Sequence, residues 1–109
     1  MKNNKTKIIA EIGVNHNGDI NRAINLINMA ASLGADFVKF QTYIATKLVT
    51  KNANLTPYQK KNTKTNKQLN LLKKYEFSFS EFSYLKKYCD KININFLSSP
   101  FDFESALFL

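Results

Sequence analysis

The chain has 109 residues, of which 44% are hydrophobic and 22% are charged, a composition typical of one small folded domain and not of a disordered segment. No apolar run approaches the roughly 18 residues that a membrane-spanning helix needs, so we expect no membrane partner. The single cysteine excludes an internal disulfide, which suits a cytoplasmic protein.

The net charge of +8 is unevenly distributed along the chain. No acidic residue lies between Asp36 and Glu76, whereas nine lysines do. A basic stretch of this kind can contact nucleic acid, attract an anionic small substrate, or form a solvated loop, and composition leaves all three open. Its aromatic residues do not alternate with the lysines as a base-stacking surface requires.

The first 42 residues predict a strand, a helix and a second strand. Residues 8–12 form an apolar run that predicts a buried strand ending at Gly13. Asp19 predicts a helix N-cap, and apolar residues follow at helical spacing until Gly34, which predicts the helix end. Residues 37–42 predict the second strand. This order of elements predicts a parallel βαβ unit.

A polar segment without a sustained period follows, from residue 43 to residue 66, and predicts a long loop. Loops of this length inside a compact domain usually carry function. Residues 68–75 predict a short helix with leucines on one face.

The next predicted helix carries a strong start signal. Ser78 and Glu81 form a capping box, and Phe77 and Phe82 occupy the apolar positions that flank it. Cys89 lies on the apolar face of this helix, so we expect a packing residue and not a nucleophile.

Residues 95–98 predict a third strand, closed by Ser99 and Pro100, and the pattern is again helical from Phe103 onwards. Three strand–helix units leave strand edges without partners. We therefore expect a truncated α/β chain that holds the first three strands of a larger fold.

Polar side chains follow each strand at its carboxyl end, where the reacting groups of parallel α/β proteins gather. Glu11 and Lys39 lie within apolar strands, where a charge is costly unless it is paired or functional. They form either a structural ion pair across adjacent strands or part of a site. Gln41 shares the face of Lys39. His16, in a turn, is more typical of a hydrogen-bonded loop residue than of a ligand or base.

Ser98 and Ser99 end the third strand, and they could instead cap the helix that begins near Asp102. The sequence contains no glycine-rich dinucleotide motif, no Walker A motif and no paired-cysteine or HExxH zinc motif.

Three segments, taken in order, resemble the opening of the sialic acid synthase family, which includes N-acetylneuraminate, legionaminate and pseudaminate synthases. The segments are residues 11–18 (EIGVNHNG), 34–42 (GADFVKFQT) and 96–102 (FLSSPFD). Residues 58–63 also resemble the family's long second loop. The resemblance extends over almost the whole chain, from residue 8 to residue 109.

The resemblance implies a TIM (β/α)8 barrel, of which this chain would be the first three βα units, followed by a small antifreeze-like domain. It also implies a homodimer and a divalent metal, Mn²⁺ or Mg²⁺, whose ligands would lie outside this chain. The implied reaction joins phosphoenolpyruvate to an N-acylated amino sugar and releases phosphate. The implied partners are thus small molecules and not nucleic acid.

The same resemblance implies roles for five residues. Glu11 would be catalytic, in proton transfer or in orienting water. Lys39 would neutralise the phosphoenolpyruvate anion. Gln41 and Asn62 would contact the sugar. Ser99 stands where the family usually has threonine, and its hydroxyl would bind phosphate.

The alternative is a non-catalytic barrel fragment that binds an anion or a phosphosugar. Because the metal-binding histidines and the closing domain of the family are absent, we expect the 109-residue chain by itself to be inactive and prone to aggregation.

Overall fold

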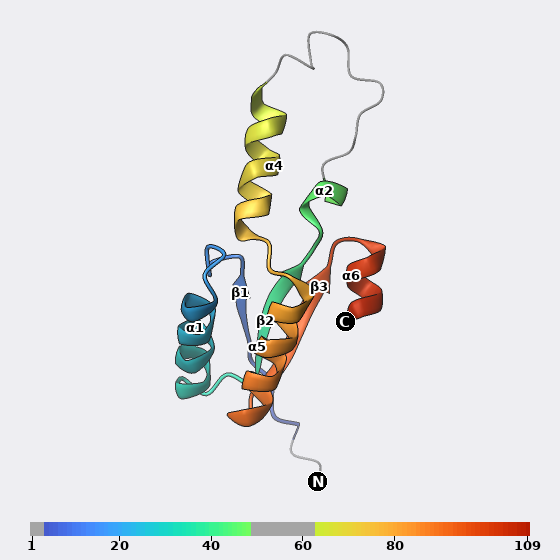
Figure 1. Cartoon of the computed structure of the whole chain (residues 1–109). Helices are drawn as coiled ribbons and strands as arrows, with labels where there is room; N and C mark the ends of the chain where they lie inside the picture. Colours follow the sequence, from blue (N-terminus) through green and yellow to red (C-terminus); the bar gives the residue numbers. More distant parts are fainter. Residues whose placement is uncertain (1–3, 49–62) are drawn as a thin grey trace.

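The computed structural model describes residues 4–48 and 63–109, with the backbone alone for residues 63–66. Three strands form one parallel sheet in the order β1-β2-β3 (Figure 1). The strands are β1 (Ile9–Gly13), β2 (Phe37–Thr42) and β3 (Asn95–Pro100). The helices are α1 (Ile20–Ser32), α2 (Ala45–Leu48), α4 (Thr63–Tyr75), α5 (Phe79–Lys91) and α6 (Phe103–Phe108). The α/β class and the parallel βαβ unit are confirmed.

Helix α1 begins and ends where the sequence predicts. The Asp19 carboxylate accepts hydrogen bonds from the N–H groups of Asn21 and Arg22, at 2.8 and 3.3 Å, and so satisfies two amides of the first turn. After the helix, Gly34 adopts a φ of +88°, the left-handed conformation that favours glycine.

Helix α5 begins with the predicted capping box. The Ser78 hydroxyl accepts from the Glu81 N–H, and the Glu81 carboxylate accepts from the Ser78 N–H. The rings of Phe77 and Phe82 meet edge to face, 5.6 Å apart. Cys89 is fully buried, and its burial raises the pKa of the thiol to about 11, so its role as a packing residue is confirmed.

One face of the sheet forms the hydrophobic core. Val38 and Phe40 of β2 are fully buried there, against Ile27 of α1 and against Phe82 and Leu85 of α5. Each such side chain contributes about 1.5–3 kcal/mol by leaving water. The core therefore holds α1 and α5 on one side of the sheet, and the charged side chains of the strands lie on the opposite face.

The prediction that the first strand is buried is wrong for its first half, since Ile9 is 51% exposed. β1 is an outer strand of the sheet, and Ile9 pairs with Phe37 on the face opposite the core. By contrast, Ile12 is 5% exposed, and it lies in the bulge between Glu11 and Gly13 that interrupts the pairing with β2.

The prediction of one long loop over residues 43–66 is wrong at both ends. The short helix α2 begins at Ala45, and α4 begins at Thr63 instead of residue 68. The first part of α4 is polar, so it lacks the apolar period by which a helix is recognised in a sequence. The described helices include none with the length and hydrophobicity that a bilayer crossing requires.

Candidate functional site

The strand register places four of the five predicted site residues on the face of the sheet opposite the core. Glu11 pairs with Lys39 across β1 and β2, and Gln41 pairs with Ser99 across β2 and β3. Side chains of paired positions point to the same face, and alternate residues of a strand share that face. The fifth residue, Asn62, lies outside the described residues.

Glu11 and Lys39 form an ion pair, with 3.3 Å between Glu11 Oε2 and Lys39 Nζ. Their side chains are 48% and 37% exposed, so solvent screens the attraction and the pair adds little to stability. The pairing predicted for adjacent strands is therefore present. Because both groups remain accessible, the lysine can also meet an anion and the carboxylate a second partner.

Gly13 makes room for the side chains of this face. A Cβ atom at Gly13 would lie 3.3 Å from Glu11 Oε1 and 3.5 Å from Gln41 Nε2, so the Glu11 carboxylate and the Gln41 amide converge beside this glycine. Its φ of +56° is also unfavourable for other residues. Gly13 is the residue of the site that sequence reasoning missed. The available signal was a glycine directly after the strand that carries Glu11.

Hydrogen bonds join the carboxyl ends of β2 and β3 and the connections that follow them. Thr42 and Ser98 share a hydrogen bond of 2.6 Å between their hydroxyls. The Asp102 carboxylate accepts from the Ile44 N–H and from the N–H and hydroxyl of Ser105, each at 2.8 Å. Burial raises the pKa of Asp102, but these hydrogen bonds outweigh it and hold the pKa below its usual value.

The possibility that Ser98 and Ser99 cap the next helix is wrong, because Asp102 itself is the N-cap of α6. Ser98 turns to the core face, where it bonds Thr42, whereas Ser99 belongs to the register of the opposite face.

His16 is fully buried in the turn between β1 and α1. Its ring stacks on Phe77, with 3.9 Å between centroids, and its Nδ1 accepts a hydrogen bond of 2.9 Å from the Gly18 N–H. Burial lowers the pKa of His16 to about 4, against a smaller opposing influence of Glu81. The imidazole is therefore neutral near pH 7, with its proton on Nε2. The expectation of a hydrogen-bonded loop residue is confirmed.

A divalent metal does not fit the described residues. They contain no group of three or more His, Cys, Asp or Glu side chains close enough to hold one. His16 is enclosed by aromatic rings and its Nδ1 is already engaged. The described residues therefore offer no site for a divalent metal.

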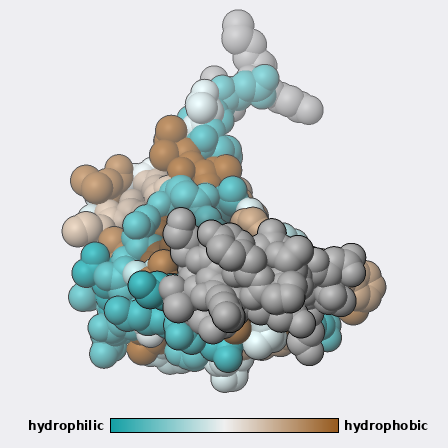
Figure 2. All heavy atoms as spheres, turned by 90° about the horizontal axis from the view of Figure 1, so that it is seen from above, coloured by the Kyte–Doolittle hydropathy of each residue, from teal (hydrophilic) through white to brown (hydrophobic). Residues whose placement is uncertain are grey.

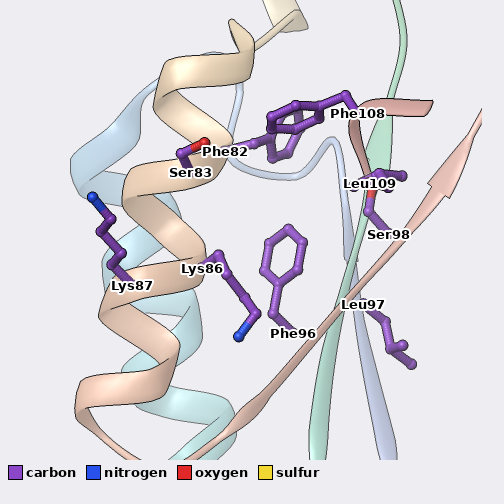
Figure 3. A pocket seen from close by; sticks show the side chains of 9 residues that line it. All are labelled: Phe82, Ser83, Lys86, Lys87, Phe96, Leu97, Ser98, Phe108 and Leu109. Atoms are coloured by element: carbon purple, nitrogen blue, oxygen red, sulfur yellow. The ribbon is translucent and has the colours of Figure 1, made fainter. Parts of the chain in front are cut away.

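The described residues line two hollows, of which only the smaller adjoins the candidate site. The larger, about 450 Å³, lies between α5, β3 and α6 on the core side of the sheet. Phe96 points toward α5 there, whereas Leu97 points away from it (Figure 3). This hollow is lined by neither Glu11 nor Lys39. The smaller, about 240 Å³, includes Gln41 in its wall and so adjoins the charged face.

Comparison with known proteins identifies the family of this chain. Residues 26–109 match the NeuB family. The N,N'-diacetyllegionaminic acid synthase of Campylobacter jejuni is 49% identical over 103 residues, and that of Legionella pneumophila is 43% identical over 103 residues. Each alignment covers 94% of this chain but only 31% and 29% of the relative.

A solved structure shares the fold. It is the N-acetylneuraminic acid (sialic acid) synthetase of Leptospira borgpetersenii, in complex with citrate, with a TM-score of 0.80 and 36% identity. The match covers 98% of this chain and 33% of the synthetase chain. This chain thus spans about a third of the length of the proteins it resembles, and it belongs to the NeuB family.

Proposed function

We propose that the protein carrying this chain joins phosphoenolpyruvate to an N-acylated amino sugar, forming a nonulosonic acid and releasing phosphate. The observation that supports the proposal most is the convergence of Glu11, Lys39 and Gln41 at the carboxyl ends of neighbouring parallel strands. In parallel α/β proteins this is where substrates bind.

The proposed reaction forms one carbon–carbon bond. The methylene carbon of phosphoenolpyruvate attacks the aldehyde carbon of the sugar, and the aldehyde oxygen takes up a proton. Water adds to the neighbouring carbon, and phosphate leaves.

In this proposal Lys39 neutralises the phosphoenolpyruvate anion by a charge-assisted contact. Glu11 moves a proton or orients the water. Gln41 and Asn62 hold the sugar, and the Ser99 hydroxyl binds phosphate. Lys39 would exchange its contact with Glu11 for the substrate anion, which would free the carboxylate for its own step.

The proposal also covers what lies outside this chain. The chain would be the first three βα units of a TIM barrel, with an antifreeze-like domain beyond the barrel, in a cytoplasmic homodimer. Mn²⁺ or Mg²⁺ would be held by side chains outside residues 1–109. The parallel order β1-β2-β3 and the match to the Leptospira synthetase support the barrel.

The sugar is proposed to carry two acylamino groups. Support comes from two relatives named for a diacetylated product, which are 49% and 43% identical to this chain, against 36% for the sialic acid synthetase.

The test uses the natural polypeptide that contains this chain, with phosphoenolpyruvate, a diacylated amino sugar and Mn²⁺. Phosphate release and product mass are measured for the wild type and for Glu11→Gln and Lys39→Ala. We expect Glu11→Gln to lower kcat by about 10²–10⁴-fold while phosphoenolpyruvate still binds. We expect Lys39→Ala to weaken that binding. The control is Lys86→Ala, which removes an exposed lysine paired with Asp90 on α5.

The alternative, a non-catalytic domain that binds an anion or a phosphosugar, predicts a different pattern. It predicts phosphoenolpyruvate binding without phosphate release, loss of affinity in Lys39→Ala alone, and no effect of Glu11→Gln.

A further inference from the structure

The smaller hollow beside the candidate site is almost entirely apolar. Its volume is about 240 Å³, and its walls come from separate parts of the chain. Val14 belongs to the turn after β1, Leu48 to α2, Leu72 and Tyr75 to α4, and Phe101 to the connection after β3. Sites that enclose a whole small molecule measure roughly 300–1,000 Å³, so this hollow suits one substituent of a substrate.

We name this hollow the acyl pocket. Hydrogen bonds hold its walls in place. Tyr43, which also lines it, is 4% exposed, and its hydroxyl donates to the Leu72 carbonyl at 2.8 Å. The Ile44 N–H next to it is bound by Asp102. A pocket fixed before the ligand arrives loses little ordering free energy on binding.

The polar member of the acyl pocket is Gln41, which also belongs to the candidate site. Its amide nitrogen and the Glu11 carboxylate lie on either side of the Cβ position of Gly13, at 3.5 and 3.3 Å. Gln41 therefore lies between the acyl pocket, whose wall it forms, and Glu11 of the Glu11–Lys39 pair. A primary amide offers two N–H donors and one carbonyl acceptor, so Gln41 can donate to the C=O of an acylamino group or accept from its N–H.

An apolar pocket with an amide at its edge matches the chemistry of an acylamino group. We propose that the acyl pocket receives the methyl end of the second acylamino group of the sugar, while Gln41 pairs with its amide. This inference rests on the proposed function and assigns Leu72, Tyr75 and Val14 to substrate specificity. A sugar with a hydroxyl in place of that group leaves the pocket unfilled.

The test exchanges volume between the protein and the substrate, again with the natural polypeptide that contains this chain. Phosphate release is measured with three sugars that differ only in the second substituent: acetamido, butanoylamino and hydroxyl. The variant is Leu72→Ala, and the control is Leu71→Ala, which truncates the neighbouring leucine of α4 that is 50% exposed. Leu72→Val is a milder variant if Leu72→Ala unfolds.

We expect the wild type to prefer both acylamino sugars over the hydroxyl sugar, because a pocket of about 240 Å³ has room for either acyl chain. Leu72→Ala should reduce kcat/KM for the acetamido sugar about tenfold and for the butanoylamino sugar less, because the longer chain replaces part of the lost contact. The hydroxyl sugar is expected to change little in either variant. Leu71→Ala should keep the wild-type order of sugars.

Two outcomes overturn the inference. One is that Leu72→Ala alters all three sugars by the same factor, and the other is that it alters none. Calorimetric titration of each sugar measures the same preferences without turnover. Wild-type protein that binds the sugars in the expected order but releases no phosphate would therefore contradict the proposed function and leave the acyl pocket supported.

Discussion

At the scale of single residues, the burial of His16 makes the stability of the fold depend on pH. Its pKa in the fold is about 4, below the value of about 6.5 of an exposed histidine. The unfolded chain therefore binds a proton at a higher pH than the folded chain does. The stability that depends on a neutral His16 is fully present above pH 6.5 and is lost as the pH falls toward 4.

We expect the free energy of unfolding to decrease by up to roughly 3 kcal/mol between pH 6.5 and pH 4 because of this one residue. His16→Phe retains an aromatic ring against Phe77 but cannot titrate, so its pH dependence should be shallower. Urea unfolding of the natural polypeptide at pH 7.5, 6 and 5 measures the difference. Equal slopes for wild type and variant would assign the acid sensitivity to other groups.

At the scale of elements, the turn after β1 and the end of α4 are in direct contact through Gly18. A Cβ atom at Gly18 would lie 2.0 Å from the Lys74 carbonyl oxygen, far inside any real contact, and its φ is +74°. Gly34 has a φ of +88° as well, but a Cβ atom there meets nothing within 4 Å. Both glycines therefore need a positive φ, but only Gly18 lies so close to another part of the backbone that a side chain would collide with it.

This difference predicts two unequal substitutions. Gly34→Ala should cost about 1–2 kcal/mol, the strain of a left-handed backbone. Gly18→Ala should cost roughly 3 kcal/mol or more, because α4 must also move. Thermal unfolding of both variants measures the gap, and substrate affinity should fall in Gly18→Ala alone because α4 forms a wall of the acyl pocket. A similar loss of stability in both variants would contradict this prediction, because it would show that α4 can move away from residue 18 at little cost.

Elements with a local signal could be predicted from the sequence, whereas contacts between elements could not. The Asp19 cap and the Ser78–Glu81 box involve neighbours in the chain, and both are confirmed. The polar start of α4 and the exposure of Ile9 depend on what packs nearby, which no local pattern contains. At the site, Glu11, Lys39 and Gln41 were identifiable as polar residues at strand ends, but the close approach around Gly13 required coordinates.

At the scale of the whole molecule, the sheet has one covered face and one face where apolar and charged side chains are mixed. Ile9 and Leu97 are 51% and 37% exposed beside the Glu11–Lys39 pair. Seen from above, apolar surface appears in several patches among polar surface (Figure 2). The outer strands β1 and β3 add backbone groups that can pair with another chain.

We therefore expect the isolated 109-residue chain to self-associate and to show no turnover of phosphoenolpyruvate with an N-acylated hexosamine and Mn²⁺. Light scattering and binding of an apolar dye measure the association, and phosphate release measures the turnover. A monodisperse chain that releases phosphate would contradict this expectation and show that a third of the length of the relatives suffices for catalysis.

The spacing of the strands along the chain has a consequence for how the family can vary. Ile9 pairs with Phe37, and Phe37 with Asn95, so the second connection is about twice as long as the first. Doubling a loop adds only about 0.6 kcal/mol of closure entropy. Insertions and deletions between α2 and α4, outside the core helix α5, therefore cost little closure entropy, while they alter the segment that leads into α4 and the acyl pocket. Under the proposed function, selection for a different sugar can act on the length of the segment between α2 and α4 at little risk to the sheet.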